Sequence, residues 1–366
     1  ISEYKNGSFT SKSILRQGLV YYNSGDNTKA IERFKKVVNE YPGTEDAIQA
    51  VQNARIAYND AGQTAEFANW VKGVDFVDIS TAELEHDAYE AADKLLAQNK
   101  KEQAIKGFKD YISQYPNGSY ATKASFNIAE LLYAENKTAE AKNYYSAVNS
   151  KTKNEYTEPA LVRLATISMQ EKNNTESMTY LKSLLGVASN EQNILFAQSN
   201  LMKLYLNHKE LTTAATYAQQ VVKNSKADKK VLSDAYVVLG RDAIQTGNKA
   251  QAKTYFESLS KIATGEAAAE ALYYDAYFKT EDKKYDASNT AVQKLAKDYA
   301  SYQYFGAKGL VLMAKNFHGL KDSYQAVYVL ESVISNFKQY DDVVQEANAL
   351  LSQYKSQESK RNSSVK

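Results

Sequence analysis

One motif recurs along the chain every 35 to 39 residues, and a period of this length indicates a stack of similar structural units. The repeated position is a small residue near the start of a helical segment, and a large apolar residue follows four positions later. The nine small-residue positions are Ala30, Phe67, Ala104, Ala141, Ser177, Ala214, Ala252, Ala287 and Ala326. The partner positions are Phe34, Val71, Phe108, Tyr145, Leu181, Ala218, Phe256, Ala291 and Leu330.

The composition favours helices as the repeated elements. The 366 residues include 3 prolines and 15 glycines, which are few breakers for a chain of this length. Two prolines follow predicted helix ends at Pro42 and Pro116, and Pro159 lies in the first turn of a predicted helix. The sequence therefore predicts an all-α protein of helix pairs joined by short turns.

Two units show the repeat most fully. The first contains Ile14, Gly18, Tyr21, Gly25, Ala30, Phe34 and Pro42, and the seventh contains Tyr236, Leu239, Gly240, Gly247, Ala252 and Phe256. The spacing Gly-x2-Tyr, then Ala-x3-Phe, then Pro resembles that of the tetratricopeptide repeat family. This resemblance implies a right-handed superhelical solenoid of about nine helix hairpins with a C-terminal capping helix.

Five segments are expected along the chain. Pairs 1 and 2 occupy residues 1–74, a linker or hinge occupies 75–80, and pairs 3 to 9 occupy 81–340. An amphipathic capping helix is expected at 341–355, because Val343, Ala347 and Leu350 lie on one stripe that would cover the last pair. The polar residues 356–366 are expected to form a mobile tail.

Chemistry that would mark an enzyme is missing from the sequence. There is no phosphate-binding loop, nucleophile elbow or zinc-binding His-Glu-x-x-His motif, and the three histidines, His86, His208 and His318, are far apart. Lys and Arg total 45 against 43 for Asp and Glu, so no overall charge attracts nucleic acid. We therefore expect no catalytic residue, no cofactor, no metal site and no nucleic-acid partner.

Alternative functions remain open. A glycan- or nutrient-binding lipoprotein built on the same hairpins would need long loops between the helices, and an α/α-barrel glycosidase would need two carboxylates across an aromatic cleft. The 29 tyrosines could stack on bases or sugars, but most fall on or beside predicted packing positions. A protein-binding scaffold is the preferred interpretation.

In the family that the chain resembles, the first helix of each pair lines a concave groove. The residues expected on that inner face combine aromatic and cationic side chains, which suit a peptide or protein ligand. They are Lys12, Tyr22, Tyr89, Lys123, Phe126, Tyr133, Phe196, Lys203, Arg241, Lys308 and Lys315. Phe126 is open to a second interpretation, in which it packs between repeats.

Two further segments resemble the long tetratricopeptide proteins of the Bacteroidetes cell envelope: residues 273–278, Tyr-Tyr-Asp-Ala-Tyr-Phe, and residues 306–323, with Gly306, Gly309 and Gly319. The resemblance implies an exported protein in the periplasm or associated with the envelope. Its partners would be other proteins, such as outer-membrane or energy-transduction complexes. Because the chain begins at Ile1, we expect a longer precursor to carry the signal or lipid anchor.

Overall fold

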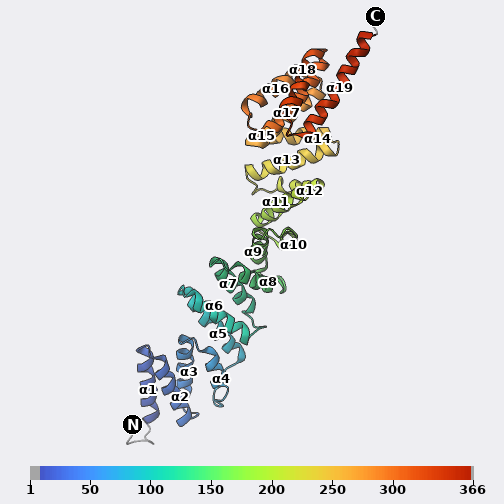
Figure 1. Ribbon diagram of the computed structural model, residues 1–366. Coiled ribbons are helices and arrows are strands. Elements are labelled where there is room, and N and C mark those ends of the chain that lie inside the picture. Colours follow the sequence, from blue (N-terminus) through green and yellow to red (C-terminus); the bar gives the residue numbers. More distant parts are fainter. Residues whose placement is uncertain (1–8, 364–366) are drawn as a thin grey trace. The chain divides into compact units, whose positions relative to one another are not determined.

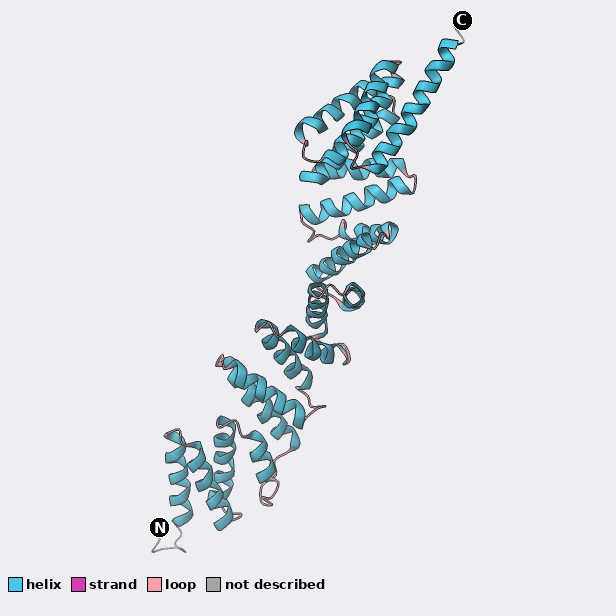
Figure 2. Ribbon diagram, in the orientation of Figure 1, coloured by secondary structure: helices cyan, strands magenta, loops and turns pink. Residues whose placement is uncertain are grey.

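The computed structural model describes the backbone of residues 9–363 and the side chains of residues 9–359. In this part of the chain every regular element is an α-helix, and Figure 2 shows helices and loops without a strand. The chain divides into two compact units, Ile1–Tyr180 and Leu181–Lys366. The all-α prediction is confirmed.

The first unit contains alternating first and second helices of successive pairs (Figure 1). They are α1 (Thr10–Asn23), α2 (Asn27–Glu40), α3 (Glu45–Asp60), α4 (Thr64–Val71), α5 (Thr81–Ala97), α6 (Lys101–Gln114), α7 (Ala121–Ala134), α8 (Thr138–Asn149) and α9 (Thr157–Gln170). α10 (Asn174–Val187) begins in this unit and ends in the second.

The second unit continues the alternation and ends in a long single helix. Its helices are α11 (Glu191–Asn207), α12 (Leu211–Val221), α13 (Lys229–Gln245), α14 (Lys249–Ser260), α15 (Gly265–Glu281), α16 (Tyr285–Asp298), α17 (Gln303–Gly319), α18 (Ser323–Asn336) and α19 (Asp341–Ser363). Between residues 9 and 363 there are thus nine helix pairs followed by one helix, as predicted.

One turn geometry closes all nine pairs of the described chain. The middle residue of each three-residue turn has a left-handed conformation, with φ between +57° and +83°. These residues are Gly25, Gly62, Asn99, Asn136, Lys172, Lys209, Gly247, Lys283 and Lys321. The next amide donates back across the helix end, as from Asp26 N to Tyr21 O at 2.9 Å, which is the bond of a Schellman cap. The turn recurs every 36 to 38 residues and so sets the period.

Close packing inside each pair follows from the repeated small and large residues. Ala30 and Phe34 have no exposed surface, and a Cβ added to Gly18 would lie 2.5 Å from the Phe34 ring. The glycine thus lets α1 approach the ring that fills the space between α1 and α2. Eight of the nine predicted small-residue positions are buried, and Ala287 is the exception.

The prediction for the eighth pair was wrong by one residue. Ala287 is exposed, whereas Ser288 is fully buried at the start of α16, and Val292 is buried in place of Ala291's predicted role. The hydroxyl of Ser288 donates to the Ala276 carbonyl at 2.8 Å. A buried serine is acceptable here because its polar group is satisfied, which an apolar pattern does not reveal.

The predicted hinge lies within the first unit, between α4 and α5. Phe76, Val77 and Ile79 are half-buried against the core that includes Val74 and Leu84. Bending at 75–80 would have to disturb these contacts, so the hinge stays a prediction with a definite cost.

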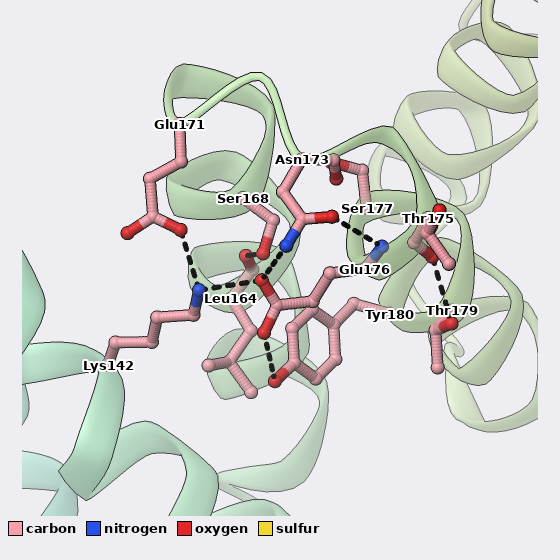
Figure 3. A network of polar contacts seen from close by, with 10 residues as sticks. All are labelled: Lys142, Leu164, Ser168, Glu171, Asn173, Thr175, Glu176, Ser177, Thr179 and Tyr180. Carbon is pink, nitrogen blue, oxygen red and sulfur yellow. Dashed lines mark hydrogen bonds and ion pairs between the residues drawn. The ribbon is translucent and has the colours of Figure 1, made fainter.

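A polar network joins α8 to the turn between α9 and α10 (Figure 3). The Lys142 ammonium lies 2.6 Å from a carboxylate oxygen of Glu171 and 2.6 Å from one of Glu176. Asn173 and Tyr180 donate to the two oxygens of Glu176 at 3.1 and 3.2 Å. The bond from Lys142 lowers the pKa of Glu176 below its usual range. Polar contacts therefore supplement apolar packing between these two pairs.

The last helix is longer than predicted. α19 continues from Asp341 to Ser363, through much of the segment expected to be a tail. Gln, Glu, Lys and Arg are good helix formers, and no glycine or proline ends the helix near residue 355. Mobility of residues 364–366 falls outside the described residues.

Candidate functional site

A cavity of about 700 Å³ opens between the first helices α11, α13 and α15 of the second unit. Its apolar surface, here called the groove floor, consists of Met202, Leu206, Val237, Val238, Ile262 and Ala267. Met202 and Val238 are buried, and the other four are half-buried. The volume lies within the range of about 300–1,000 Å³ that is usual for ligand sites.

A buried ion pair forms one wall of this cavity. Arg241 of α13 donates from Nε and Nη2 to the two carboxylate oxygens of Glu270 on α15, both at 2.7 Å. The Glu270 side chain is 3% exposed and that of Arg241 is 41% exposed. The bond to Glu270 raises the pKa of Arg241 further above its usual value. The guanidinium is thus held rigidly at the cavity surface.

The opposite wall carries more cationic than acidic groups. Lys203 of α11 lies 3.2 Å from Asp234 of α13, and both side chains are about half exposed. Lys229 and Lys230, in the first turn of α13, make no ion pair with any described residue. A ligand with a carboxylate beside an apolar side chain would match this surface.

Similar cross-helix ion pairs join other neighbouring first helices. In the first unit Arg163 of α9 binds Glu130 of α7 through two bonds of 3.0 Å, and Asp60 of α3 lies 2.7 Å from Lys94 of α5. In the second unit Lys315 of α17 lies 2.6 Å from Glu346 of α19. Much of the charge on these faces is therefore neutralised within the protein.

Comparison with family models matches residues 71–198 to the tetratricopeptide repeat-like domain and residues 12–44 to the tetratricopeptide repeat. The chain is a tetratricopeptide repeat protein. This fold points in general to a scaffold for protein–protein interaction, and such repeat proteins are generally non-catalytic.

Other comparisons add the repeat fold but no further function. No curated protein matches this tetratricopeptide repeat protein. A tetratricopeptide repeat protein from Parabacteroides merdae is 14% identical, with 69% of this chain and 93% of that one covered and a TM-score of 0.25. The C-terminal part of a repeat protein from Cytophaga hutchinsonii is 11% identical over 69% of this chain and 98% of that one, with a TM-score of 0.38. For Pseudomonas aeruginosa pilF the identity is 13%, the coverage 69% and 90%, and the TM-score 0.32.

The groove of this repeat protein contains two of the residues predicted for it, Lys203 and Arg241. Both are tied to acidic partners on the next first helix. The groove floor was missed by the sequence analysis, although the i, i+1 pair Val237-Val238 on a first helix was visible there.

Tyr89 is a correction to the predicted groove. Its side chain is fully buried and its ring stacks on Tyr120 at a centroid distance of 4.5 Å. Lys123, half-buried, lies 4.9 Å from the centre of the same ring. Burial raises the pKa of the Tyr89 hydroxyl, which donates to Asp93 at 3.2 Å. Tyr89 is therefore a core residue without surface for a ligand, because α5 packs this position against α6 and α7.

Phe126 and Tyr133 both pack around the buried Tyr145 of α8, with ring centroids 6.1 and 6.4 Å away. Both are half-buried, and the Arg163 guanidinium lies 4.5 Å from the centre of the Tyr133 ring. These contacts favour the second interpretation of Phe126, in which it helps to pack neighbouring repeats.

The remaining predicted residues lie outside the cavity. Lys12 is exposed and Phe196 is half-buried, while Tyr22 donates its hydroxyl to Asp60 at 2.6 Å. Lys308 lies 4.9 Å from the centre of the Tyr273 ring, and Lys315 is bound to Glu346 as described above. Their role in binding stays a prediction.

Two searches of the described residues bear on other functions. None of the helices there combines the length and the apolar character that crossing a membrane requires. Over the same residues, no three His, Cys, Asp or Glu side chains come together in a way that could hold a metal ion.

Replacing Arg241 with Ala should lower the free energy of unfolding by about 2 kcal/mol, because Glu270 would keep a buried charge without its partner. This value is below the usual cost for a fully buried pair because the guanidinium is partly exposed. The double change Arg241→Met and Glu270→Leu should recover most of the loss in urea unfolding. A single variant as stable as the parent would show that the pair does not constrain the two helices.

Proposed function

We propose that this protein is a non-catalytic scaffold that holds a segment of a partner protein in the cavity between α11, α13 and α15. The observation that carries this proposal is the combination of a groove floor of apolar side chains with fixed and unpaired cations around it. An apolar side chain of the partner would displace water from the floor, and an acidic neighbour would face Lys229, Lys230 and Arg241.

A protein ligand suits this surface better than a glycan. The pairs around the cavity are joined by three-residue turns, such as residues 208–210 between α11 and α12. Such turns provide little chain for a loop-built sugar site, and the described cavity is lined mainly by helix side chains. An envelope-associated complex as the larger assembly rests on the sequence resemblance to Bacteroidetes envelope proteins.

Photo-crosslinking in the native cell tests the groove and the assembly together. A photoreactive phenylalanine in place of Val237 should give a discrete crosslinked partner, because this residue lies in the groove floor. The same group in place of Gln219, which is exposed on α12 and outside the cavity, is the matched control. An equal pattern from both positions would contradict the groove, and a cytosolic partner would contradict the envelope assignment.

The affinity for the captured partner should then fall about thirtyfold or more on Val237→Glu, since a charge would enter the apolar floor. Gln219→Glu adds the same charge outside the cavity and should change affinity by less than about twofold. Helix content by circular dichroism must be unchanged in both variants. Equal binding by Val237→Glu and the parent would exclude this cavity.

A further inference from the structure

A second cavity of about 530 Å³ lies on another side of α15, between α14, α15 and α16. The groove uses Glu266, Ala267 and Glu270 of α15, whereas this cavity uses Ala268, Ala271 and Leu272. At about 100° per residue, these two sets lie on different faces of the helix. The second cavity is therefore separate from the groove of the proposed function.

The inner surface of this cavity is apolar. It is formed by Phe256 of α14 with Ala268, Ala271, Leu272 and Phe278 of α15. Phe256 and Ala271 are each 2% exposed, so these atoms have little contact with water. An apolar space of this kind holds water poorly and gains dispersion contacts when an apolar group fills it.

Lysines surround the apolar surface and are incompletely neutralised. Asp282 is shared by Lys253 at 3.4 Å and Lys284 at 3.6 Å, while Lys279 lies 2.7 Å from Asp275. Lys294 of α16 also lines the cavity and makes no ion pair with the described residues. One further anion can therefore bind near Lys294 without breaking an existing pair.

We propose that this cavity binds a small apolar monocarboxylic acid, with the hydrocarbon part against Phe256 and Phe278 and the carboxylate near Lys294. Burial of the hydrocarbon supplies most of the affinity, and the unpaired ammonium selects the ionised acid over a neutral analogue. The cavity has the volume of a small-molecule site, about 300–1,000 Å³. A free acid fits a cavity enclosed by three helices of one unit, whereas a peptide would need a longer open surface.

Calorimetric titration of the full chain with decanoate and with decanol tests the proposal. Decanoate should bind saturably and at least about fivefold more tightly than decanol, which has the same tail without the charge. Lys294→Glu should remove this preference and leave decanol binding unchanged, because the substitution alters the charge and not the apolar surface. Lys297→Glu, with the same charge change at an exposed position of α16 outside the cavity, should keep the preference.

Three results would overturn the proposal: no saturable binding, decanoate and decanol binding equally, or Lys297→Glu acting as strongly as Lys294→Glu. Ala268→Leu provides a second measurement and should weaken both ligands at least about tenfold by filling the space. Its melting curve must first show that the unit remains folded, and the two lysine variants decide the matter if it does not. Neither result depends on the partner crosslinked at Val237.

Discussion

Deleting residues 341–366 should lower the free energy of unfolding of the second unit by roughly 5 kcal/mol, because α19 supplies part of its core. Val343, Ala347 and Tyr354 of α19 are buried, and they pack in one cluster with Leu330 and Val333 of α18. The deletion would expose these α18 side chains to water. Hydrogen exchange in α17 and α18 should become much faster, and the protein should tend to associate.

Deletion of residues 356–366 is the control, since Tyr354 and all other α19 residues of that cluster remain. Its stability should stay within about 0.5 kcal/mol of the parent in urea unfolding. A monomeric protein without residues 341–366 that melts like the parent would show that α19 does not cap the ninth pair.

Replacing Gly240 with Val should destabilise the seventh pair by about 3 kcal/mol, because the new side chain has no room. A Cβ added at Gly240 would lie 2.6 Å from the ring of Phe256, which is itself 2% exposed. The ring cannot move aside without disturbing Tyr274, which stacks on it at 3.8 Å. Thermal unfolding followed by circular dichroism measures the loss.

Gly306→Ala is the matched control in the same unit. Gly306 also lies in a helix, but no atom is within 4 Å of an added Cβ. Alanine should therefore stabilise the helix by about 0.5–1 kcal/mol through its better helix propensity. If Gly240→Val melted like the parent, close approach of α13 and α14 would not be needed.

The helix pairs could be predicted because local signals repeat through the chain. Small residues such as Ala30 and Ala252 marked the second helices, and Gly25 and Gly247 marked two of the turns. The other turns use glycine, asparagine or lysine at the same left-handed position. Lysine gives no turn signal in the sequence, so the period was read less regularly than the turns place it.

The groove was predicted less well, because a face of one helix does not reveal what the next helix places against it. Arg241 was expected to be free for a ligand, but Glu270, 29 positions later in the chain, binds it with two hydrogen bonds. Tyr89 was expected at the surface, but its ring is covered by Tyr120 and Lys123. Both outcomes depend on the register between successive pairs.

The sequence by itself determined the all-α class, the number of helix pairs and the tight contact at Gly18 and Gly240, since these follow from periodicity and side-chain size. The tertiary structure alone decided where cavities remain and which charges are paired. Lys203 meets Asp234 while Lys230 meets no acidic partner in the described chain, although all three are ordinary charged residues in the sequence. The reason is physical: ion pairs and cavities depend on distances of a few ångströms between helices that the repeat pattern does not fix.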